Sequence, residues 1–357
     1  LGSPRERASR RYLMANGRPS HIGGGRHDLL DAVSRAARRA KSMSCLPQVF
    51  STFRPVVERW YLACCDDAGV TPAEVPLKLE DLALEVPRTF RSEFAAVTPP
   101  PAVRITWNGL ASLWAFSQAV VRVGRPMFEA QRTADPTAGP PQLAIGGELE
   151  EGLHLFELSS RLSRNKFDGW VDWAPVPDPD AVGASLGGNR TFENALGWIM
   201  RHELAHLRLN HHAVAEPLPH EAKEQEFQAD AQATHWMKGS LQVDPGRALE
   251  TRPSETELDL ERRALGMFTG LAWVAQFELV PHGNSSTHPP VMDRIGRMIG
   301  DLRLADDSFA CEMLSYVTKV LVDPEGVWPP DQEVPTAKDA AMEAMFRLSR
   351  AVAAFKG

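Results

Sequence analysis

The chain has 357 residues, of which 43% are hydrophobic and 24% charged, as in an average soluble protein with ample length for a core. Its formal net charge of −7 argues against a general nucleic-acid binder, so we expect no nucleic-acid partner. The four cysteines include the adjacent Cys64 and Cys65 and form no CxxC motif, which is typical of a reducing cytosol.

Basic residues dominate the start of the chain. The arginines of residues 1–44, joined by Lys41 and opposed by few acids, predict a flexible basic arm or a segment that docks on an acidic partner. No apolar core follows them, as a signal peptide would require. The most apolar runs, 110–124 and 264–280, are shorter than the roughly 20 residues of a membrane span. We therefore expect buried helices there, a cytoplasmic location and no membrane partner.

Helices are predicted in the first part of the chain. Residues 46–70 have apolar residues at helical spacing, and 71–86 read as a turn followed by a short helix. A stronger helical pattern begins at Trp107 and is expected to end at Gly124 and Pro126.

The middle of the chain predicts a small sheet. Residues 142–162 alternate enough to suggest one or two strands around Gly146 and Gly147. After a loop rich in proline and glycine, Thr191 is expected to cap the next helix, which carries the sequence HELAH. More helices follow to the end of the chain.

This order of elements predicts an α+β fold that is mostly helical. We expect a zincin-type catalytic domain with a small sheet beside the HELAH helix and extra N-terminal helices. The predicted division is a basic flexible arm (1–44), a helical N-terminal region (45–135), a zinc metallopeptidase core (136–305) and a C-terminal helical region (306–357).

The HELAH motif places His202 and His206 four residues apart, so both imidazoles can face one metal ion from one side of a helix. Glu203 lies between them and can take a proton from a water molecule that zinc activates. The pattern therefore predicts two zinc ligands and a general base.

Two schemes compete for the third ligand. His212 has the spacing of the metzincin third histidine, but that pattern turns at a glycine where this chain has Leu209, so a helix break at Asn210 would be needed. The other scheme uses Glu226 and Asp230, an ExxxD pair at helical spacing in a segment with small alanines. We predict Glu226 as the ligand and Asp230 as the support of a ligand histidine, while Glu221 and Glu224 stay open.

HELAH, EFQAD and the later SSTHPPVMDRIGRM together resemble the three motifs of the HtpX and CAAX-prenyl type of gluzincin metallopeptidases. With no membrane domain, the chain resembles more closely the phage-exclusion Lit-like peptidases, over about residues 190–300. Carried over by position, the resemblance places His288 and Arg294 beside the site. His288 could stabilise an oxyanion or only cap a helix, and Arg294 could pair with Asp230.

The resemblance implies a zinc-dependent endopeptidase with a bacterial defence role. Lit-like peptidases cleave elongation factor Tu in infected bacteria and need a trigger, so the expected partners are a protein or peptide substrate and an activator that is also a protein or peptide. In gluzincins a strand at the cleft edge binds the peptide, and residues 148–158 are the predicted strand. The alternative is a zinc-stabilised binding or regulatory protein that acts on a partner repressor.

Overall fold

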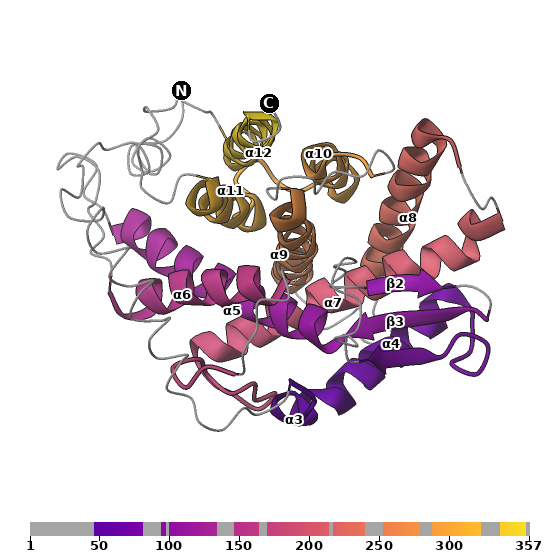
Figure 1. Cartoon of the computed structure of the whole chain (residues 1–357). Coiled ribbons are helices and arrows are strands. Elements are labelled where there is room, and N and C mark those ends of the chain that lie inside the picture. The colour runs from indigo at the N-terminus through magenta and orange to yellow at the C-terminus, as the bar shows by residue number, and fades with distance from the viewer. Residues whose placement is uncertain are drawn as a thin grey trace.

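The computed structural model combines long helices with one small sheet (Figure 1). It describes residues 46–80, 94–97, 100–133, 146–163, 170–213, 217–239, 253–278, 288–322 and 336–354. The α-helices are α3 (Leu46–Val49), α4 (Arg54–Ala68), α5 (Trp107–Thr133), α6 (Gly147–Ser163), α7 (Ala184–Arg208), α8 (Pro219–Gly239), α9 (Pro253–Glu278), α10 (Val291–Leu302), α11 (Phe309–Val322) and α12 (Ala337–Ala354). Two 3-10 turns, η1 (Ser51–Phe53) and η2 (His211–Ala213), join them. The predicted class, α+β and mostly helical, is confirmed.

The sheet has the strand order β1-β3-β2. Strand β1 (Leu77–Glu80) runs parallel to β3 (Ala102–Thr106), and β2 (Phe94–Val97) pairs with β3 in the antiparallel sense. Strand β2 therefore lies at one edge of the sheet, and it contacts α7 (Figure 1). As expected, a small sheet lies beside the helix that carries HELAH.

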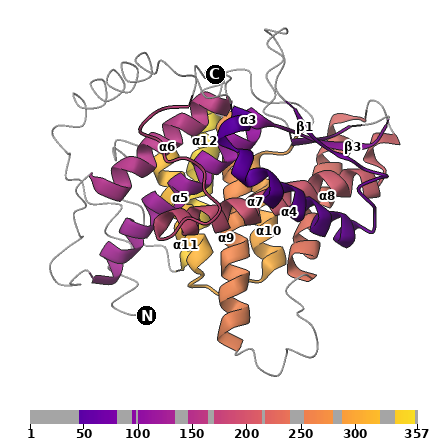
Figure 2. The same cartoon turned by 90° about the horizontal axis from the view of Figure 1, so that it is seen from below.

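Helix α7 is the central element of the fold. It packs against α4, α5, α8 and α9, which surround it in both views (Figures 1 and 2). Apolar residues occur all round the helix, a pattern typical of a buried helix. The buried apolar residues that precede the motif are Phe192, Ala195, Leu196, Trp198, Ile199 and Met200. This packing holds the HELAH segment in a fixed position within the core.

The strands predicted within 142–162 are wrong, because the chain forms α6 from Gly147 onward. Leu155, Leu158 and Leu162 recur at helical spacing and are buried against the rest of the core. Gly152 lies where α6 meets α5, since an added Cβ would come within 3.1 Å of the Val123 main-chain nitrogen. Residues 148–158 are thus helical, and they cannot serve as the extended strand predicted to bind a peptide.

The short helix predicted within 71–86 is also wrong where the structure describes it. Residues 77–80 form β1, because pairing with β3 satisfies their main-chain groups. Residues 81–86 lie outside the described part of the chain.

Two predicted helix boundaries are wrong. Helix α5 continues through Gly124 and Pro126 to Thr133, and Gly124 lies against the side chain of Met313, which an added Cβ would overlap. Helix α7 begins at Ala184, after Gly183 with a φ of 64°, so Thr191 is a buried residue inside the helix and caps nothing. In both cases tertiary packing overrides a local breaker or cap signal.

Several expectations fall on other parts of the chain. The basic arm of residues 1–44 lies outside the described residues. Among the described helices, none is both long and apolar enough to cross a membrane. The apolar runs 110–124 and 264–278 lie in α5 and α9, which are buried as predicted. Cys64, Cys65 and Cys311 are buried free thiols.

Candidate metal centre and active site

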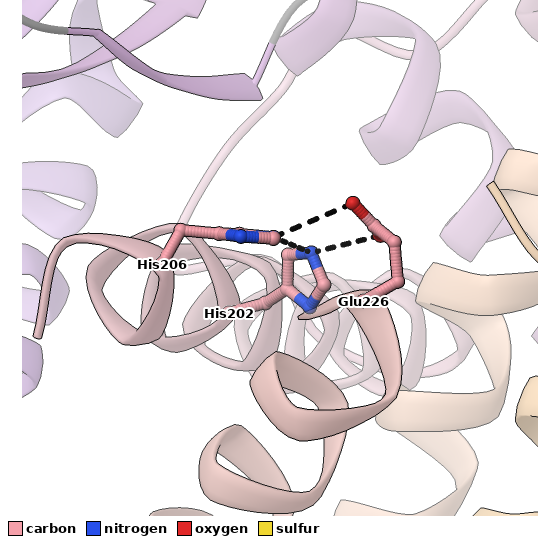
Figure 3. A group of neighbouring side chains, drawn as sticks. All are labelled: His202, His206 and Glu226. Carbon is pink, nitrogen blue, oxygen red and sulfur yellow. Dashed lines mark hydrogen bonds and ion pairs between the residues drawn. The ribbon is translucent and has the colours of Figure 1, made fainter. Parts of the chain in front are cut away.

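The two histidines of HELAH face the same point in space. They lie one turn apart on α7, and their Nε2 atoms are 3.0 Å apart (Figure 3). The Trp198 ring packs beside His202, with 5.7 Å between ring centroids. Both imidazoles thus present the nitrogen farther from the main chain to a common site.

Glu226 on α8 completes the group. Its Oε2 lies 3.5 Å from Nε2 of His202, and its Oε1 lies 3.5 Å from Nε2 of His206 (Figure 3). One donor atom from each residue falls within 4.8 Å of the others, an arrangement that could hold a metal ion. Ala229, fully buried on α8, lets the two helices approach closely.

Asp230 and Arg294 lie behind these three side chains. Nδ1 of His202 is 2.9 Å from Oδ1 of Asp230, a close polar contact although its angles fall outside those of a standard hydrogen bond. Arg294 of α10 donates from Nε and Nη2 to the two oxygens of Asp230 at 2.7 and 2.6 Å. Its Nη1 also lies 3.5 Å from Glu226. A bidentate pair of this kind fixes the carboxylate rigidly beside the His202 ring.

The buried histidines and carboxylates of the site shift one another's pKa values. Burial opposes a charged imidazole, yet Asp230 and Glu226 raise the pKa of His202 to about 10. Burial and the neighbouring His202 lower the pKa of His206 to about 3. Burial would raise the pKa of Glu226, but His202 and Arg294 hold it well below its usual value. One carboxylate oxygen and two imidazole nitrogens form a donor set that fits a divalent metal ion.

Glu203 points to the sheet side of the same site. Its Oε2 accepts a 2.7 Å hydrogen bond from the main-chain N–H of Ala96 in β2. Burial raises the pKa of Glu203 to about 7, although the nearby His202 and the Ala96 hydrogen bond oppose this shift. A carboxylate that titrates near neutral pH is well suited to act as a general base.

His288 reaches the rim of the site just before α10. Its side chain is 57% exposed, and its Nε2 lies 3.5 Å from Oε1 of Glu226. Pro290 is the N-cap residue of α10, and His288 precedes it by two positions. His288 therefore does not cap this helix, contrary to one of the two predictions for it. Thr287 lies outside the described residues. The structure therefore brings together His202, Glu203, His206, Glu226, Asp230, His288 and Arg294.

A model of the peptidase U49 family matches residues 103–314, from β3 to α11. The chain belongs to this family. The matched range contains His202, His206 and Glu226, the group that could hold a metal ion.

One curated relative is a cell death peptidase of Escherichia coli K12, which is 26% identical to this chain over 197 residues. The match covers 54% of this chain and 60% of the relative, so the chain spans less than two thirds of that protein's length. No solved structure matches. These findings support the predicted resemblance to Lit-like peptidases.

His211 is a residue of the site that no motif in the sequence indicates. We expect from the sequence that His211 and His212 are cations at the end of the motif helix. For His211 this is wrong: it is buried, burial lowers its pKa, and its Nδ1 lies 2.9 Å from Nδ1 of His206. The helix does break at Asn210, which has a φ of 57°, but the break turns His211 inward and leaves His212 exposed. No sequence pattern specifies which of two adjacent histidines turns inward.

Proposed function

We propose that this U49 peptidase is a zinc-dependent endopeptidase of the gluzincin type. The observation that carries the proposal is the convergence of His202, His206 and Glu226 from two helices, with Glu203 next to them. Two histidines and one glutamate are the ligand set of thermolysin-like catalytic zinc sites, which keep a fourth position open for water or substrate.

The surrounding residues support zinc in particular. Zinc prefers nitrogen and oxygen donors in a tetrahedral arrangement, and ligating histidines usually have a carboxylate at their other ring nitrogen. Asp230 lies at Nδ1 of His202, and Arg294 holds Asp230 by two hydrogen bonds. The roles proposed for these two residues are to orient His202 and to keep its ring basic.

The proposed chemistry divides among the residues of the site. When bound, zinc would supply a Lewis acid that polarises the scissile carbonyl and acidifies a water molecule. Glu203 accepts a proton from the attacking water and later returns it to the leaving amine. His288, exposed at the rim, is placed to donate a hydrogen bond to the developing oxyanion.

We propose that the substrate peptide lies in extended form along β2. This strand is an edge of the sheet, and the main-chain N–H of Ala96 faces Glu203. An edge strand binds an extended peptide through main-chain hydrogen bonds. Peptide bound there would pass directly in front of the proposed general base.

A bacterial defence role is part of the proposal. It is supported by the similarity to a protein named cell death peptidase. Under this proposal the partners are a protein substrate and a protein or peptide activator, and the enzyme acts in the cytoplasm.

The test compares new protein N-termini in a bacterial lysate treated with the wild-type protein or with Glu203→Gln. We expect new termini with the wild type and a loss of at least about 100-fold with Glu203→Gln, which lacks the general base. Both proteins should bind one zinc ion. If neither protein produces new termini while both bind zinc, the result points to a missing activator or to the alternative, a zinc-stabilised binding or regulatory protein.

A further inference from the structure

We propose that His211 and Gln228 are positioning residues that hold His206 in the one tautomer able to bind the metal. The proposal rests on the metal site proposed above. It assigns a role to two residues that are neither ligands nor proton-transfer groups.

The contact between His206 and His211 depends on the helix break. After Leu209 the main chain adopts the left-handed conformation at Asn210, one of the residue types that tolerate it best. The chain then folds back as η2, which brings the His211 ring to 5.0 Å from the His206 ring, at an interplanar angle of 74°. His211 is only 8% exposed, so the contact is screened from solvent.

Hydrogen-bond chemistry links the two rings. Their Nδ1 atoms are 2.9 Å apart, so one of them must donate a proton and the other must accept it. His206 needs an unprotonated Nε2 to bind a metal, and a neutral ring then carries its proton on Nδ1. His206 is therefore the donor in the metal-binding state, and Nδ1 of His211 is the acceptor.

Gln228 presents its amide oxygen to His211. Nε2 of His211 lies 3.2 Å from the amide oxygen of Gln228, an atom that can only accept a hydrogen bond. His211 therefore carries its proton on Nε2, which leaves Nδ1 free to accept from His206. A donor in place of this oxygen would reverse both bonds and put a proton on Nε2 of His206, where the metal should bind.

Gln228 is suited to a test by substitution, because this residue is exposed on α8. Gln228→Glu presents only acceptors to His211, and Gln228→Lys presents only donors. The same two changes at Gln225, which is also on α8, alter the net charge in the same way and serve as matched controls. The first readout is zinc affinity, measured by competition with a coloured chelator.

We expect Gln228→Lys to weaken zinc binding by about tenfold or more, the usual effect of losing a hydrogen-bond partner behind a metal ligand. Gln228→Glu should bind zinc at least as tightly as the wild type, and both Gln225 variants should bind within about threefold of it. If the Gln225 pair separates as widely as the Gln228 pair, charge alone explains the effect and the proposal is overturned.

The second readout reports the proton positions directly. In the zinc-free wild type, long-range proton–nitrogen NMR spectra of protein labelled with ¹⁵N-histidine should show His211 protonated on Nε2 and His206 protonated on Nδ1. The opposite pattern overturns the proposal. Glu226→Ala separates the two hypotheses. If it keeps full zinc affinity, the metal site and the positioning role both fail. If it loses zinc while Gln228→Glu and Gln228→Lys bind zinc equally well, only the positioning role fails.

Discussion

The Nε2 atoms of His202 and His206 are too close for both to carry a proton. At 3.0 Å, two protonated nitrogens would point their hydrogens at each other. The two Nε2 atoms therefore carry at most one proton between them. A tetrahedral zinc ion with bonds of about 2.05 Å would hold two nitrogens about 3.3 Å apart, which is close to the observed spacing. The side chains therefore need only a small adjustment to bind a metal.

The two candidate third ligands differ in how they would respond to mutation. Glu226→Ala removes both oxygens that lie 3.5 Å from the two rings, so we expect the zinc affinity to fall by about 100-fold or more. His212→Ala removes an exposed ring outside the metal-binding group and should leave the affinity unchanged. Elemental analysis after dialysis at limiting zinc measures both. Zinc loss from His212→Ala with retention by Glu226→Ala would refute the choice of Glu226.

At the residue scale, the sequence predicts most of the site because its patterns are local. HELAH fixes two rings by helical spacing alone, and EFQAD places Glu226 and Asp230 one turn apart in the same way. The contact of His211 with His206 could not be predicted, because it depends on the main-chain conformation of Asn210.

At the scale of elements, α7 and α9 are in close contact at Gly266. A Cβ at this position would overlap the side chain of Asn194 and lie 3.0 Å from the main-chain nitrogen of Ala195. Main chain cannot move aside as a flexible side chain does, so the absence of a side chain at Gly266 sets the distance between the two helices.

Gly266→Ala should therefore destabilise the protein by about 1–3 kcal/mol, the usual cost of overpacking. Gly300→Ala is the matched control, because it lies in α10 with no atom within 4 Å of the added Cβ. It should stabilise the protein by up to about 1 kcal/mol through the better helix propensity of alanine. Chemical denaturation followed by circular dichroism measures both, and equal effects of the two substitutions would contradict this packing.

The elements that the sequence predicts wrongly are those that depend on contacts with distant segments of the same chain. Residues 77–80 form a strand only because β3 lies beside them, and α6 is a helix although its sequence alternates in part. The edge strand next to the site is β2, which comes from a part of the chain where the sequence predicts no strand. Pairing over long range, unlike helical spacing, leaves little trace in a short window.

For the molecule as a whole, the proposed metal ion would join α7 to α8, and Arg294 extends the connection to α10. A metal that binds only the folded chain stabilises it by mass action. If the proposed metal binds, the site also stabilises the fold.

Removing the metal should lower the thermal stability. With free zinc at 100 times its dissociation constant, the folded protein gains about 2.7 kcal/mol, which corresponds to a rise in Tm of about 4 °C for a chain of this length. Differential scanning calorimetry with zinc, and after chelation, measures this difference. The double variant His202→Ala/His206→Ala should show no response, and an equal rise in it would mean that zinc binds elsewhere on the chain.

The hydrogen bond from Ala96 to Glu203 has a further consequence. Its donor belongs to the polypeptide backbone, so nineteen of the twenty amino acids at this position would preserve it, and only proline lacks the N–H. An alanine scan would not detect this position, because it is already alanine, and a comparison of sequences would find no invariant residue there. The proposed catalytic carboxylate thus depends on the main-chain N–H of residue 96 and not on its side chain.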